Sequence, residues 1–124
     1  MSRPDPDNVP RAALDAGPGV YEMTPAELDA RRRGPAPPVV VDVREPWEYS
    51  VARIAGAQLV PLGTLGAALS TFDPAQDYVL YCHHGVRSLR AAEFLRARGL
   101  TRVANLTGGI DAWSQQVDPA VQRY

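Results

Sequence analysis

The sequence predicts an α/β protein with a mainly parallel central sheet and helices on both faces. Short apolar runs typical of buried strands alternate along the chain with segments of helical spacing. This alternation favours a parallel sheet, because a parallel connection needs a crossover that is usually a helix. The 124 residues, 45% of them hydrophobic, suffice for one domain with a packed core. Ligands of such sheets bind beyond the carboxyl ends of strands, so the residues found there are the candidate site.

Three strands and two helices are predicted in the first half of the chain. Strand, helix, strand, helix and strand follow one another at residues 20–23, 24–33, 39–43, 45–49 and 56–59. The first helix has the clearest start, because Thr24 is followed by Pro25 at the first helical position and by Glu27, as in a capping box. The strand at 39–43 reads Val-Val-Val-Asp-Val, which is apolar enough to be buried on both faces.

Three helices and two strands are predicted in the second half. Helix, strand, long helix, strand and short helix follow at residues 62–69, 78–81, about 88–99, 103–106 and 110–113. The helix at 62–69 is predicted despite Gly63 and Gly66. Asp42 and Cys82 both lie at carboxyl ends of predicted strands, so they share one edge of the sheet if those strands are neighbours.

The predicted domain organisation is an N-terminal arm, residues 1–18, followed by one folded domain, residues 19–124. Four prolines among charged and small residues suit a mobile or surface-wrapped arm better than a strand or helix. The start of the chain lacks the apolar run of a signal peptide, and no stretch approaches the length of a membrane span. We therefore expect a cytoplasmic protein with no membrane partner.

The composition excludes several functional classes. The formal net charge of −1 gives no overall attraction to nucleic acid, so no nucleic-acid partner is expected. All 13 basic residues are arginine, and the absence of lysine excludes Schiff-base chemistry and a P-loop lysine. A single cysteine excludes an intramolecular disulfide, as expected of a protein in a reducing compartment. No cofactor is expected.

The chain's one cysteine stands where a strand meets a helix, in the sequence Tyr-Cys-His-His-Gly-Val-Arg-Ser. Backbone amides at the start of that helix should point at Cys82, and the positive helix end stabilises a thiolate. Gly85 permits the tight turn, and Arg87 adds a permanent cation. This pattern predicts a nucleophilic thiol. The alternative is a small buried residue that merely closes the strand.

His83 and His84 follow the cysteine and raise the question of a metal site. We expect no structural metal, because adjacent side chains rarely converge on one ion and no other Cys or His completes a tetrahedron. One histidine is expected to face solvent while the other lines the pocket, with proton transfer as the alternative role.

Two charged residues, Asp42 and Arg44, lie at the end of the strand predicted at 39–43. Asp42 is expected to be structural, since a carboxylate at the end of a buried strand must be paired or hydrogen-bonded. Arg44 is a candidate for contacting a substrate anion, ranked behind Arg87.

Four motifs in order resemble those of single-domain rhodaneses, which are sulfurtransferases. They are Asp42-Val43-Arg44-Glu45-Pro46-Trp47-Glu48-Tyr49, Arg53-Ile54-Ala55-Gly56-Ala57, Cys82-His83-His84-Gly85-Val86-Arg87-Ser88 and Asn105-Leu106-Thr107-Gly108-Gly109-Ile110-Asp111-Ala112-Trp113. The resemblance implies the rhodanese-like α/β fold and a persulfide on Cys82. Together with the resemblance, the sequence pattern gives Cys82 and Arg87 as the candidate catalytic residues. The candidate substrate-binding residues are His83, His84, Gly85, Val86, Ser88 and Arg44.

Two features of the Cys82 loop, residues 82–88, bear on the reaction. Cys82 to Arg87 spans six residues, one fewer than in related phosphatases of the cell-division-cycle type, so the ring suits a persulfide better than a phosphate. Family members that use thiosulfate well often carry basic residues where this chain has His83 and His84. The preference for thiosulfate is therefore open and is expected to fall as pH rises.

The expected function is transfer of a sulfane sulfur from a small donor such as thiosulfate to a thiol acceptor. Since the chain has no second cysteine, the persulfide needs an external acceptor. The alternative is a relay module that takes sulfur from a cysteine desulfurase and passes it to a dedicated partner. Residues 117–124 resemble the end of rhodanese domains fused to adenylyltransferases that serve sulfur-carrier proteins. A weaker alternative is a phosphatase or arsenate reductase.

Overall fold

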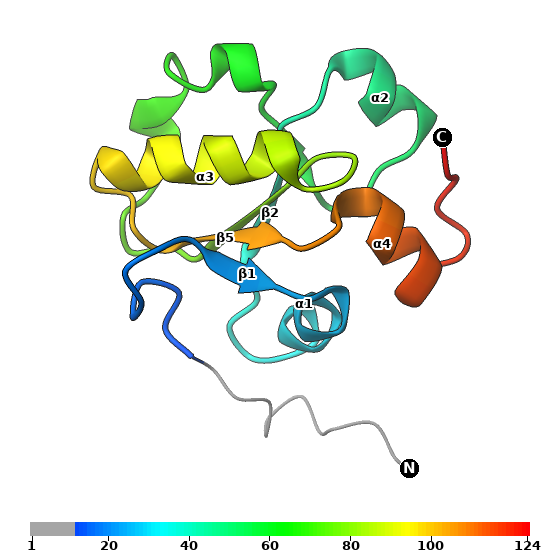
Figure 1. Cartoon of the computed structure of the whole chain (residues 1–124), viewed down its shortest axis with the longest axis horizontal. Coiled ribbons are helices and arrows are strands. Elements are labelled where there is room, and N and C mark those ends of the chain that lie inside the picture. The colour runs from blue at the N-terminus through cyan, green and yellow to red at the C-terminus, as the bar shows by residue number, and fades with distance from the viewer. Residues whose placement is uncertain (1–11) are drawn as a thin grey trace.

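The computed structural model describes residues 12–124, which form one parallel sheet with helices on both faces (Figure 1). The strands are β1 (Tyr21–Met23), β2 (Val39–Asp42), β3 (Gln58–Leu59), β4 (Tyr78–Tyr81) and β5 (Val103–Leu106). They pair in the order β1-β5-β4-β2-β3, and every pairing is parallel. The helices are α1 (Pro25–Arg32), α2 (Pro46–Val51), α3 (Val86–Ala97) and α4 (Gly109–Gln116). The predicted fold class is confirmed.

The two faces of the sheet are covered by different helices. One core cluster joins α1 and α4 to the sheet through side chains such as Leu28, Ile110 and Trp113. The other joins α3 through Ala91, Ala92 and Leu95. Figure 1 shows α3 on one side of the strands and α1 on the other. All four residues of β4 are buried, because this strand lies at the centre of the sheet and is covered on both faces.

The helix starts follow the local signals in the sequence. Thr24 caps α1 by accepting a hydrogen bond from the Glu27 amide at 3.1 Å, and Pro25 occupies the first turn. At α2, Glu45 and Glu48 form a capping box. The cap fixes Glu48 on the first turn of α2, where its side chain is buried.

The helix predicted at residues 62–69 is wrong. The structure has two 3-10 turns there, η2 (Leu62–Thr64) and η3 (Leu69–Thr71). Gly63 and Gly66 each disfavour helix by about 1 kcal/mol relative to alanine, and two in one short segment outweigh its apolar spacing. Leu65 is buried between the turns, and Leu62 and Leu69 pack against the same core cluster, so the segment is anchored without a continuous helix.

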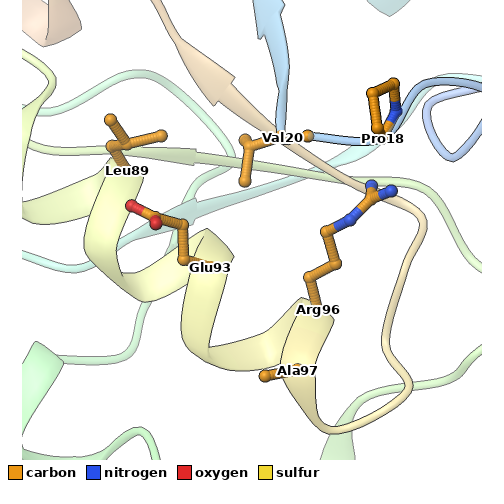
Figure 2. Close-up of a pocket in the computed structure, with 7 residues that line it drawn as sticks. Pro18, Val20, Leu89, Glu93, Arg96 and Ala97 are labelled. Atoms are coloured by element: carbon orange, nitrogen blue, oxygen red, sulfur yellow. The ribbon is translucent and has the colours of Figure 1, made fainter.

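The described part of the predicted arm, residues 12–18, packs against the domain. Leu14 is buried in the core, and Arg96 of α3 donates a hydrogen bond to the Gly17 carbonyl at 2.5 Å. A pocket of about 580 Å³ lies between residues 18–20 and α3, and Figure 2 shows Val20, Leu89 and Glu93 in its wall. The rest of the arm, residues 1–11, lies outside the described residues. Within residues 12–124, no helix is both long and apolar enough to cross a bilayer.

Candidate functional site

Cys82 directly follows the central strand β4, and its sulfur is turned toward the start of α3. Its Sγ lies 3.1 Å from the Gly85 amide nitrogen and 3.4 Å from the Ser88 amide nitrogen, and both amides donate to it. The Ser88 hydroxyl lies 3.3 Å from the same sulfur. Gly85 is the N-cap of α3, with a φ of 105° that favours glycine. The structure thus brings together the predicted nucleophile and the loop amides, and the residue is only 1% exposed.

A second helix start supports the Cys82 loop from outside. The amides of Ile110 and Asp111, in the first turn of α4, donate to the carbonyls of Cys82 and His83 at 2.9 and 3.1 Å. A Cβ atom on Gly109 would lie 2.4 Å from the His83 carbonyl oxygen, so only glycine permits this approach. The Gly108–Gly109 pair, expected from the sequence to form a backbone turn near the pocket, packs against this loop.

Asn105 is a site residue that the sequence analysis did not single out. From β5, beside β4, its amide donates to the Gly85 carbonyl at 3.2 Å. Its Oδ1 accepts from the Ser88 hydroxyl at 2.5 Å. Ser88 has one hydroxyl proton, so while this bond is made its oxygen faces Cys82 as an acceptor. The available signal was a polar residue within the otherwise apolar sequence Val-Ala-Asn-Leu.

Arg87 ties the Cys82 loop to α2. Its guanidinium makes two hydrogen bonds to the Glu48 carboxylate, at 2.6 and 2.9 Å, and its side chain is 38% exposed. The charge is also close enough to interact electrostatically with Cys82. Hydrogen bonds from Arg87 lower the pKa of Glu48 from its usual 4.5 to about 2. The sequence identified Arg87 but not this partner, 39 residues away in the chain.

The Arg87–Glu48 pair predicts a loss of stability in acid. Because the folded-state pKa of Glu48 lies below the unfolded value, the pair stabilises the fold above about pH 4.5 and loses this contribution as pH falls toward 2. Glu48→Gln should lower the free energy of unfolding at pH 7 by about 2 kcal/mol, and the difference from wild type should shrink steadily on acidification. Urea unfolding of both proteins between pH 3 and 7 measures this. A difference that is constant with pH would contradict the prediction.

Arg44 is not placed to contact a substrate anion. Its side chain is completely buried, and its Nε and Nη2 donate to the two carboxylate oxygens of Asp42 at 2.9 and 2.6 Å. Nη2 also donates to the Ala52 carbonyl at 2.6 Å. Asp42 has the structural partners that its position required, including the Tyr81 hydroxyl, which donates to it at 2.8 Å. The expected role of Arg44 in anion contact therefore has to be replaced by a structural one.

His83 and His84 lie on the outer side of the Cys82 loop. The His84 side chain is 64% exposed, whereas the His83 ring is half-buried and stacks between His84 and Tyr124, with both centroid distances 4.0 Å. Burial, helped by the nearby His84, lowers the pKa of His83 and so favours the neutral form of its ring. Val86, the remaining candidate in the loop, is 62% exposed.

The two histidines and Asp111 place three potential metal ligands within 4.8 Å of one another. The rings are nearly parallel, with an interplanar angle of 24°, so their nitrogen lone pairs do not converge. Asp111 is already bonded to Arg123 and Gln115. That the site holds no metal remains a prediction.

Comparisons with known proteins agree with this geometry. The family model described as "Rhodanese-like domain" matches residues 24–116. A protein named sulfurtransferase from Allochromatium vinosum is 33% identical over 102 residues, covering 82% of this chain and 95% of its own length. A probable adenylyltransferase/sulfurtransferase, MoeZ of Mycobacterium tuberculosis, is 35% identical over 104 residues, which cover 82% of this chain and 26% of MoeZ. The chain thus spans about a quarter to a third of the longer curated relatives it matches.

The solved structures give the same result. A crystal structure of a rhodanese-like domain protein from Staphylococcus aureus has a TM-score of 0.74 and 30% identity, and the match covers 85% of this chain and 99% of that one. The family match includes β4, the Cys82 loop and both helix starts that meet at it. The family model matches most of the chain, the solved structures share its fold, and one relative is matched over 95% of its length. The chain therefore belongs to the rhodanese-like domain family.

Proposed function

We propose that this rhodanese-like domain is a sulfurtransferase that carries a sulfane sulfur as a persulfide on Cys82. The observation that supports this most is the pair of backbone amides, of Gly85 and Ser88, that donate to the sulfur from within 3.4 Å. Such donors stabilise a thiolate before the reaction and hold a charged persulfide after it, as an oxyanion hole holds oxygen.

In the first half-reaction, the Cys82 thiolate attacks the outer sulfur of a donor such as thiosulfate. A sulfur–sulfur bond forms to Cys82 while the bond within thiosulfate breaks, and sulfite leaves with the electron pair. Arg87 favours the approach of an anionic donor, and its two hydrogen bonds to Glu48 keep its guanidinium at the loop.

In the second half-reaction, an acceptor nucleophile takes the outer sulfur. A small thiolate or cyanide attacks that sulfur, the bond to Cys82 breaks, and the Cys82 thiolate is regenerated as the leaving group. The acceptor must come from outside, since the chain has no second cysteine to form an internal disulfide. The cycle needs neither metal nor cofactor, and we place it in the cytoplasm.

A relay module is the second candidate function. The similarity to MoeZ, whose name joins an adenylyltransferase to a sulfurtransferase, favours a domain that receives sulfur from a cysteine desulfurase and delivers it to a sulfur-carrier protein. The chemistry at Cys82 is the same in both cases, and only the identity of donor and acceptor differs.

Intact mass spectrometry after incubation with thiosulfate tests the proposal. The wild-type protein should gain the mass of one sulfur atom, and Cys82→Ser should gain nothing. Subsequent loss of that sulfur to cyanide or a small thiol, with repeated turnover, supports the enzyme. A persulfide that forms but resists small acceptors supports the relay. If thiosulfate and an organic persulfide donor both leave the wild-type mass unchanged, the proposed function is wrong.

A further inference from the structure

The segment after α4 returns to the Cys82 loop and brings Tyr124 to the candidate site. The Ser114 hydroxyl of α4 donates to the Val121 carbonyl at 2.6 Å, and Arg123 pairs with Asp111 at 2.9 Å. Figure 1 shows this segment, in red, rising beside α4 and ending near α2. There the Tyr124 ring stacks on His83 with an interplanar angle of 6° and meets Trp47 edge-on at 6.1 Å.

The Tyr124 hydroxyl joins two ion pairs that would otherwise be separate. It accepts a hydrogen bond from Nη1 of the buried Arg44 at 2.7 Å and donates one to Oε2 of Glu48, also at 2.7 Å. Burial and the bond to Glu48 raise the pKa of Tyr124 to about 12, so the hydroxyl keeps the proton it donates at neutral pH. Arg44, Tyr124, Glu48 and Arg87 thus form one hydrogen-bonded chain from the core to the Cys82 loop.

This series of hydrogen bonds affects how strongly the positive charge of Arg87 attracts an incoming anion. The Glu48 carboxylate accepts hydrogen bonds from Arg87, the Tyr124 hydroxyl and the Glu45 amide. Its negative charge is therefore only partly available to neutralise Arg87. Each bond also fixes the carboxylate in one orientation, and linked bonds strengthen one another. Without the hydroxyl, more of the Glu48 charge acts on Arg87, so the carboxylate neutralises the guanidinium more completely.

We propose that Tyr124 is a positioning residue that acts through Glu48 and Arg87 to favour anionic reagents at Cys82. The proposal deepens the sulfurtransferase function and rests on it for its biological meaning: it assigns the site to anionic sulfur donors in preference to neutral ones. Arg44, which does not reach the substrate, contributes through the same chain by orienting the Tyr124 hydroxyl.

The test uses two alkylating reagents of similar size and opposite electrostatic character. Iodoacetate is an anion and iodoacetamide is neutral; in both reactions the Cys82 thiolate forms a sulfur–carbon bond and iodide leaves. The ratio of the two rate constants, measured by intact mass, reports the preference for an anion and requires no sulfur transfer. Any general change in thiol reactivity or loop order affects both rates and cancels in the ratio.

Tyr124→Phe keeps the ring on His83 and removes only the hydroxyl. We expect the iodoacetate-to-iodoacetamide ratio to fall about two- to five-fold from the wild-type value, the size of a partly exposed charge interaction. Tyr49→Phe is the matched control, because it removes a tyrosine hydroxyl from α2, the helix that carries Glu48, and no bond from this hydroxyl to Glu48 is present; its ratio should stay at the wild-type value. With thiosulfate, Tyr124→Phe should raise KM more than it lowers kcat.

A double-mutant cycle shows whether Tyr124 acts through Arg87. In an Arg87→Met background, adding Tyr124→Phe should leave the ratio unchanged, because the charge that Tyr124 positions is gone. A further fall in that background, or an unchanged or increased ratio in Tyr124→Phe alone, would overturn the inference. A wild-type protein that is alkylated as expected but never gains sulfur would overturn the proposed function instead. If neither reagent labels wild-type Cys82, both proposals fail.

Discussion

Cys82→Ser is expected to reduce sulfur transfer from thiosulfate to cyanide by about a thousand-fold or more. A serine hydroxyl is a much weaker nucleophile than a cysteine thiolate, and oxygen does not form a stable analogue of the persulfide. The measurement is steady-state thiocyanate production at saturating thiosulfate. The variant removes the nucleophile while keeping the amides of Gly85 and Ser88 supplied with an acceptor.

The loss should be confined to activity. Serine is only slightly smaller than cysteine and can accept the same two backbone hydrogen bonds. The free energy of unfolding should therefore change by no more than about 1 kcal/mol. Urea unfolding of the purified variant checks this, and unfolding of the variant under assay conditions would make its inactivity uninformative about the nucleophile. A folded variant that retains a tenth of wild-type turnover would show that Cys82 is not the sulfur carrier.

The strands and the position of the candidate nucleophile, Cys82, follow from local sequence pattern. Short apolar runs ending in a polar or reactive residue identify β2 and β4, and their parallel pairing, with Asp42 opposite Tyr81, places Asp42 and Cys82 at the same edge. That the two strands are neighbours is a property of the sheet order, which one sequence does not specify. The failed helix at 62–69 has a local cause in its two glycines.

The partners of the charged residues could not be predicted from the residues next to them in the sequence. Arg87 was identified from its place after Cys82, but Glu48 and Tyr124 reach it from α2 and from the segment after α4. Likewise, nothing in the residues around Arg44 distinguishes a guanidinium facing a substrate from one buried against Asp42. Asn105 became a site residue only because β5 lies beside β4. Sequence patterns thus identified the candidate nucleophile and its loop, whereas the partners of the charged residues are set by tertiary packing.

The buried pair of Arg44 and Asp42 should make Arg44→Met one of the most destabilising single substitutions in the domain. Both side chains are fully buried, and methionine of similar length leaves the carboxylate without the two hydrogen bonds and the charge that compensate its burial. Removing one member of such a pair costs about 3–5 kcal/mol.

Arg102→Met provides the matched control, because Arg102 also pairs with an aspartate, Asp77, at 2.8 Å, but with 44% of its side chain exposed. An exposed pair is worth about 0–1 kcal/mol, so this variant should unfold at nearly the wild-type urea concentration. The two substitutions remove the same group from the same kind of partner and differ in burial and in the two further hydrogen bonds of Arg44, to the Ala52 carbonyl and the Tyr124 hydroxyl. Equal losses for both would mean that the Arg44–Asp42 pair contributes no more than a surface ion pair, and that Asp42 tolerates burial through the Tyr81 hydroxyl and the Arg44 backbone amide alone.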